Sequence, residues 1–155
     1  MRRSSNSFLF PDVNVWLAFS YERHIHYPIA RAWIERLDDD SRLCLCRFTQ
    51  ISLLRLLTTE AVMGRDVLSQ AGAWQVYDRW LEDDRMVFIN EPPLMEASFR
   101  ALSQQTRSSP KDWADAYLAA FATVAGLRLV TFDQAFRGKS ADLLILDASV
   151  TENNS

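Results

Sequence analysis

The sequence contains few of the residues on which several common functional sites depend. Four glycines in 155 residues are too few for the usual glycine-rich phosphate-binding loops, and no G-x-S-x-G nucleophile motif occurs. The two cysteines cannot complete a structural zinc site, which uses four ligands, and neither histidine lies near an obvious nucleophile. These absences argue against phosphate-loop, serine-nucleophile and zinc chemistry.

Long apolar stretches are also absent. No run approaches the roughly 18 residues of a membrane span, and residues 8–10 are too short for the apolar part of a signal peptide. We therefore expect a cytoplasmic protein. The length fits a single domain over residues 1–155, with loosely ordered ends at 1–7 and 148–155.

Positive charge is scarce, since the net charge is −3. A protein that only binds nucleic acid is usually basic, so a polyanionic partner would need local attraction here. Of the 17 basic residues only Lys111 and Lys139 are lysines. Arginine suits bidentate phosphate contacts, although a general composition bias explains its excess equally well.

Two close pairs of possible metal ligands have simpler explanations. Cys44 and Cys46 would lie on one face of a strand, which favours two small buried side chains over a metal site. His24 and His26 favour a loop with two histidines, and a metal site there is the less favoured alternative.

Short apolar runs alternate with helical patterns along the chain. The runs predict strands at residues 8–10, 43–48, 86–89, 127–132 and 143–146. The helical patterns cover residues 27–37, 51–57, 69–81, 94–102 and 109–126, the last with Ser109 as its cap and Gly126 as its end. This alternation predicts a parallel sheet between helices, whose binding crevice lies beyond the carboxyl ends of the strands.

Three aspartates are placed to meet at that edge. Asp12 follows the first predicted strand, Asp133 follows the fourth, and Asp115 lies near the start of the helix that enters the fourth. Asp12 and Asp133 could each simply cap a helix. Asp115 is harder to explain structurally, because it would lie six residues past the cap, among small residues that favour burial.

A divalent cation would supply the charge that such carboxylates need. Clustered carboxylates bind Mg²⁺ or Mn²⁺, and such a site can activate water for displacement at phosphorus. Asp112, one turn before Asp115, is better explained as the acid of a capping box. The residues alone therefore predict metal-dependent phosphoryl chemistry at Asp12, Asp115 and Asp133.

Four motifs, in order, resemble those of the PIN-domain ribonucleases, specifically VapC-type toxins of toxin–antitoxin systems. They are FPDVNVWLA at 10–18, FTQISLLRLLT at 48–58 with AVMG at 61–64, WADAYLAA at 113–120 and LVTFDQAF at 129–136. The resemblance spans about residues 8–147. It implies a PIN-like three-layer α/β/α sandwich with a central, mainly parallel sheet of about five strands.

The resemblance also implies a function. It predicts a Mg²⁺-dependent endoribonuclease that forms homodimers and is neutralised by a small antitoxin, with Asp12, Asp115 and Asp133 as the catalytic and metal-binding residues. Asn14 and Thr131 would be supporting polar residues. On the helix 69–81, Trp74, Tyr77, Trp80 and Leu81 lie close to one face, where they either fill the core or receive a partner helix.

One position departs from the family pattern. Many PIN nucleases have glutamate in the second motif, where this chain has Gln50, which offers a carbonyl oxygen but no charge. Two groups could replace the missing carboxylate in the metal coordination: the side chain of Asp112, turned into the site, or the phosphate of the RNA substrate. We favour the RNA phosphate, because Asp112 is expected to cap its helix.

Three other functions fit parts of the pattern. A nuclease acting on structured DNA is disfavoured by the small size, and a catalytically weak or inactive RNA-binding module is kept open by Gln50. A phosphoacceptor signalling domain is disfavoured, because its acceptor aspartate is missing after Ile89, where Asn90 follows.

Overall fold

The computed structural model describes residues 7–140 and 142–147, and its centre is a five-stranded sheet. The strands are β1 (Phe8–Pro11), β2 (Arg42–Leu45), β3 (Met86–Phe88), β4 (Arg128–Thr131) and β5 (Leu143–Ile145). They run in the order β3-β2-β1-β4-β5, and every neighbouring pair is parallel. The predicted α/β fold with about five strands is confirmed, and the sheet is entirely parallel.

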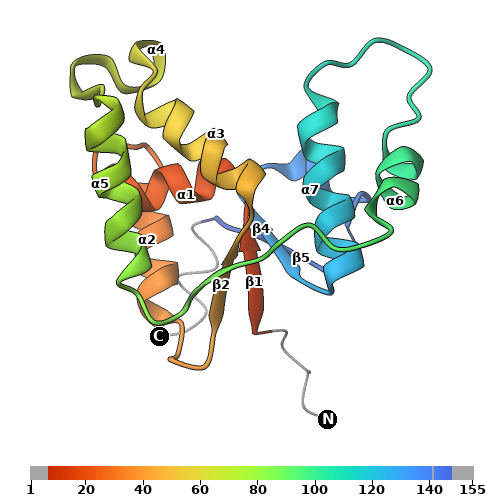
Figure 1. The fold of residues 1–155 in the computed structure, drawn as a ribbon, viewed down its shortest axis with the longest axis horizontal. Coiled ribbons are helices and arrows are strands. Elements are labelled where there is room, and N and C mark those ends of the chain that lie inside the picture. The colour runs from red at the N-terminus through yellow and green to blue at the C-terminus, as the bar shows by residue number, and fades with distance from the viewer. Residues whose placement is uncertain (1–6, 141, 148–155) are drawn as a thin grey trace.

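Helices cover both faces of the sheet, which gives three layers (Figure 1). One layer contains α1 (Val13–Ser20), α2 (Tyr27–Arg36), α3 (Arg47–Leu57) and α5 (Gln70–Leu81), with the short α4 (Glu60–Met63) and η1 (Gly64–Asp66) between the last two. The other layer contains α6 (Met95–Leu102) and α7 (Asp112–Ala125). A short 3-10 helix, η2 (Gln134–Phe136), follows β4.

Each layer buries its own apolar cluster against the sheet. The first surrounds Trp16, which is fully buried and meets Phe19 and Trp80 edge-on. The second surrounds Phe121, stacked on Phe10 with ring centroids 5.0 Å apart. Burial of such large side chains contributes about 1.5–3 kcal/mol each, so the two clusters hold the sheet edge rigidly in place.

The cysteine prediction is confirmed, since Cys44 and Cys46 are buried, free and part of the second cluster. The aromatic face predicted for the helix at residues 69–81 is buried at some positions and exposed at others. Tyr77 is buried and Trp80 packs against the first cluster, whereas Trp74 and Leu81 are about half exposed. No helix within the described residues combines the length and apolarity that crossing a membrane requires.

The start of the α7 helix corrects two predictions. The helix begins at Asp112, with Lys111 at its cap position, rather than next to Ser109. Pro110 and Lys111 form a turn closed by the Asp112 backbone N–H, which donates to the Ser109 carbonyl oxygen at 3.0 Å. Asp115 therefore lies in the first helical turn, where the helix dipole favours a carboxylate, and not beyond it.

The other boundary differences are smaller. The predicted second strand is shorter because residues 47 and 48 already belong to α3, which also starts earlier than predicted. Gly126 ends α7 as predicted, in a left-handed conformation with φ of 71° that suits glycine. The expectation of loosely ordered ends concerns residues 1–7 and 148–155. Of these only Ser7 lies within the described residues, and its carbonyl oxygen accepts from the Arg42 backbone N–H at 2.8 Å.

Candidate metal-binding active site

The order of the strands predicts a binding crevice at the carboxyl edge between β1 and β4. From β1 the chain moves outward through β2 to β3, and then returns to the opposite side of β1 for β4 and β5. Such a reversal separates the loops that leave the two central strands, and ligands bind there in parallel sheets. Asp12 follows β1 directly, and Thr131 is the last residue of β4.

Asp12 is a buried carboxylate held by the backbone of its own helix. It is only 4% exposed, and its Oδ1 accepts a hydrogen bond from the Val15 backbone N–H at 3.1 Å, which caps α1. Its Oδ2 accepts from the Thr131 hydroxyl at 2.6 Å. The capping explanation for Asp12 is thus correct, but it accounts for only one of the two carboxylate oxygens.

Thr131 connects the two strands of the crevice. While its hydroxyl donates to Asp12, the same oxygen accepts from the Asp133 backbone N–H at 3.0 Å. Thr131 is fully buried, so this bridge is protected from water. Thr131 is expected as a supporting polar residue. In the structure its hydroxyl bridges Asp12 and Asp133, and this bridge fixes the position of Asp12 relative to the loop that begins at Asp133.

Burial dominates the electrostatics of Asp12. Burial raises the pKa of the Asp12 carboxyl to about 6, against the opposing hydrogen bonds from Thr131 and Val15, and the charge of Asp115 raises it further. Within residues 7–140 and 142–147 no basic side chain hydrogen-bonds to this carboxylate. A buried carboxylate in this state favours protonation or a bound cation.

Asp115 and Asp133 stand close enough to influence each other. Burial raises the pKa of the half-buried Asp115; Lys139 lowers it, while Asp133 and Asp112 raise it again. Asp133 is exposed and caps η2 through a 2.8 Å hydrogen bond from the Ala135 backbone N–H. The three predicted acids thus gather at one edge, as the sequence suggested.

The remaining expected residues lie in α1, α7 and α3. Asn14 is exposed in the first turn of α1. Asp112 accepts a hydrogen bond from the Ser109 hydroxyl, which lowers its pKa, and forms an ion pair with Lys139, so its predicted capping-box role is wrong. Gln50 is 5% exposed, and its Oε1 accepts from Arg47 at 2.5 Å.

The donor chemistry fits a hard divalent cation, because every candidate ligand is a carboxylate oxygen. The acids are not already arranged as a complete cage: among the described residues, no three histidine, cysteine, aspartate or glutamate side chains form a ready metal-binding group. Asp12, Asp115 and Asp133 would therefore have to converge slightly around an ion.

Lys139 is the residue of this edge that the sequence did not single out as part of the site. Its ammonium lies 3.6 Å from Asp112 Oδ1, and its charge also acts on Asp115. The only signal in the sequence was the rarity of lysine, one of just two, six residues after Asp133.

The chain is similar to known proteins over most of its length. The family model described as PIN domain matches residues 9–141. Ribonuclease VapC41 of Mycobacterium tuberculosis is 43% identical over 132 residues, which are 83% of this chain and 90% of that protein.

Solved structures share the fold at low sequence identity. VapBC2 from Rickettsia felis, bound to a promoter DNA fragment, superposes with a TM-score of 0.63 at 12% identity, covering 90% of this chain and 98% of the other. VapC20 of M. tuberculosis, a toxin that cleaves the sarcin–ricin loop, gives 0.61 at 15% identity, covering 84% and 93%. From the family match and the 43% identity to VapC41, the chain belongs to the PIN-domain family, and within it to the VapC-type proteins.

Proposed function

We propose that this protein is an endoribonuclease that depends on Mg²⁺, or alternatively Mn²⁺, and cleaves RNA phosphodiester bonds at Asp12, Asp115 and Asp133. The observation that carries the proposal is the buried Asp12 carboxylate at the carboxyl ends of β1 and β4, which no basic side chain of the described residues hydrogen-bonds, with two more acids beside it. The name of the 43% identical relative, a ribonuclease, supports the substrate class.

The protein's own groups have distinct tasks in this proposal. When bound, the ion would polarise the phosphate and activate the attacking water. Thr131 and the Val15 backbone N–H fix both oxygens of Asp12, so the carboxylate needs little reorganisation to act as a ligand. Asp133 and Asp115 approach from the loop after β4 and from α7, on the other side of the crevice, and complete the oxygen donor set.

The direct test is cleavage of a mixed RNA pool by the purified protein. We expect fragments in the presence of Mg²⁺, no fragments with excess EDTA, and recovery of cleavage when Mg²⁺ is returned. A single-stranded DNA pool and a structured DNA serve as controls for substrate class. RNA binding without cleavage would instead support the inactive RNA-binding module.

Gln50 provides a prediction about metal affinity. Its carbonyl oxygen is already bonded to Arg47, and it has no charge, so the free protein should bind Mg²⁺ weakly and more tightly when RNA phosphate is present. Gln50→Glu adds a carboxylate and should tighten Mg²⁺ binding without RNA by roughly tenfold.

Calorimetric titration of Mg²⁺, with and without a cleavage-resistant RNA pool, measures this effect. Gln50→Met is the matched control, because it has similar size and no added charge. Tight binding to the wild-type protein in the absence of RNA would show that the three aspartates suffice and that Gln50 is irrelevant to affinity.

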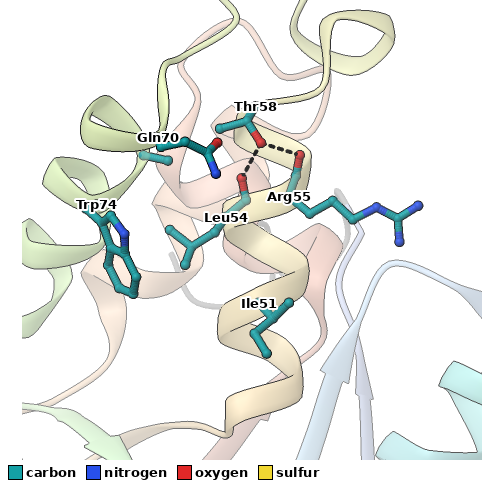
Figure 2. Close-up of a pocket in the computed structure, with 7 residues that line it drawn as sticks. Ile51, Leu54, Arg55, Thr58, Gln70 and Trp74 are labelled. Atoms are coloured by element: carbon teal, nitrogen blue, oxygen red, sulfur yellow. Dashed lines mark hydrogen bonds between the residues drawn. The ribbon is translucent and has the colours of Figure 1, made fainter.

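We further propose that the protein is the toxin of a type II toxin–antitoxin pair, forms a homodimer and binds a small antitoxin. A surface that could serve such contacts is a groove of about 340 Å³ between α3 and α5 (Figure 2), lined by Ile51, Leu54, Arg55, Thr58, Gln70, Ala73 and Trp74. Ile51 and Trp74 are 57% and 48% exposed there, and exposed apolar side chains favour association.

The dimer prediction is tested by light scattering after size-exclusion chromatography. At micromolar concentration we expect twice the mass of one 17.8 kDa chain. Trp74→Ser should shift the population toward monomer if the groove takes part, whereas Leu94→Ser, at an 89% exposed residue outside it, should not. A wild-type monomer would contradict the prediction.

A further inference from the structure

The acidic edge of the sheet contains a cation supplied by the chain itself, the ammonium of Lys139. The Lys139 ammonium lies 3.6 Å from Asp112 Oδ1, and both side chains are mostly buried, with 20% and 24% exposed. Lys139 also lowers the pKa of Asp115, against the effect of the neighbouring acids. The lysine therefore faces two consecutive acids of α7 from the loop that follows η2.

The backbone around Lys139 is held firmly, so its position is not an accident of a long side chain. The Lys139 backbone N–H donates to the Phe136 carbonyl at 3.0 Å, and Phe136 is 1% exposed in the second apolar cluster. Gly138, with φ of 87°, adopts a backbone conformation in the turn before Lys139 that favours glycine. On its β4 side the same segment is connected to the site. Asp133 is hydrogen-bonded to Thr131, and Thr131 is hydrogen-bonded to Asp12.

We propose that Lys139 is a fixed cation that neutralises the Asp112 side of the acidic cluster and limits the site to one divalent ion. A second ion would need Asp112, or a second oxygen of Asp115, as a ligand. The positive charge of the Lys139 ammonium acts on both of these carboxylates. Two cations a few ångströms apart repel each other strongly in a partly buried site. The divalent ion is thereby confined to the side of Asp12 and Asp133.

The proposal rests on the proposed metal-dependent nuclease and gives Lys139 a positioning role. By attracting the first turn of α7, the ammonium sets the direction in which Asp115 approaches the crevice. A purely stabilising ion pair would affect folding but neither the number of bound ions nor the rate of the folded enzyme. These quantities separate the two possibilities.

The test compares three variants of the full chain with the wild type. Lys139→Met removes the charge at similar length, Lys139→Arg keeps the charge, and Lys111→Met removes the other lysine, which is exposed at the start of α7. Mn²⁺ is the probe, and its free concentration is measured by electron paramagnetic resonance in titrations without RNA.

We expect the wild type, Lys139→Arg and Lys111→Met to bind one Mn²⁺ per chain, and Lys139→Met to bind two. With RNA and Mg²⁺, Lys139→Met should lower kcat by on the order of 10²-fold, as expected when a catalytic group is misplaced by about 1 Å, with a smaller change in KM. Lys139→Arg should recover most of that loss.

Two bound ions in the wild type, or one ion and unchanged kcat in Lys139→Met, would overturn the role of Lys139 while leaving the nuclease proposal intact. If the wild type fails to cleave RNA, the nuclease proposal fails, but the Mn²⁺ count still decides whether Lys139 excludes a second ion. Should Lys139→Met fail to fold, Lys139→Gln replaces it, and the wild-type count is informative by itself.

Discussion

Asparagine in place of Asp115 is expected to lower RNA cleavage by about three orders of magnitude, equivalent to roughly 4 kcal/mol of lost transition-state stabilisation. Asparagine preserves the size of the side chain and removes the charge that would hold the ion. Asp12→Asn should have the same effect, because Asp12 is the most deeply buried carboxylate of the site. Initial rates on a mixed RNA pool at saturating Mg²⁺ measure the loss.

The matched control is Asp78→Asn, which makes the same chemical change on the exposed side of α5. Its cleavage rate should equal that of the wild type, and all three variants should keep the wild-type circular dichroism spectrum. If folded Asp115→Asn protein cleaves RNA at the wild-type rate, the assignment of the metal ligands is wrong.

The stability of the metal-free protein is expected to fall as the pH rises through the range between about 4 and about 6. The native Asp12 carboxyl has a pKa of about 6, above the 3.8 expected when the chain is unfolded. Between these values the native state holds the proton more strongly, so acid stabilises the fold and ionisation destabilises it. The difference corresponds to about 3 kcal/mol, fully lost above the native pKa.

Asp12→Asn should remove this loss of stability at higher pH. Its free energy of unfolding, measured with urea in EDTA, should exceed that of the wild type by an amount that grows from near zero below pH 4 to about 3 kcal/mol at pH 7. The profile of Asp78→Asn should run parallel to the wild type. A constant difference between Asp12→Asn and the wild type would contradict the assigned pKa, while added Mg²⁺ should stabilise only proteins that retain Asp12.

Together these predictions describe a site in which stability is given up for binding. The protein keeps a charge buried at Asp12, which destabilises the metal-free fold at neutral pH, and the same charge makes the crevice attractive to a cation. In the proposed site, Lys139 neutralises the Asp112 end of the acidic cluster, so the attraction would be concentrated near Asp12, at the carboxyl ends of β1 and β4.

Local patterns were enough to predict the architecture and the three acids. Alternating apolar strands and helical stripes predict a parallel sheet because both faces of each strand must be covered. An aspartate directly after a buried strand can only lie at the carboxyl edge, which is why Asp12 and Asp133 could be placed without coordinates. The glycine at 126 and Ser69, which accepts from the Gly72 backbone N–H, were likewise correctly read as helix ends.

Other features depended on contacts between distant segments. Ser109 and Pro110 form a convincing helix start in isolation, yet the helix begins at Asp112, whose carboxylate accepts from the nearby Ser109 hydroxyl and pairs with the distant Lys139. Local capping preferences are worth about 1 kcal/mol, so such tertiary contacts can override them. The bond between Arg47 and Gln50 is local in sequence but depends on side-chain direction, which spacing does not specify.

The sequence by itself therefore determined the layers of this protein and the edge of the sheet at which Asp12, Asp115 and Asp133 lie. Only the tertiary structure decided how those acids are charged, because burial of Asp12, the Thr131 bridge across 119 residues of sequence and the approach of Lys139 to α7 are long-range. Periodicity reports which face of an element is apolar, whereas a pKa depends on every group that surrounds the carboxylate in space.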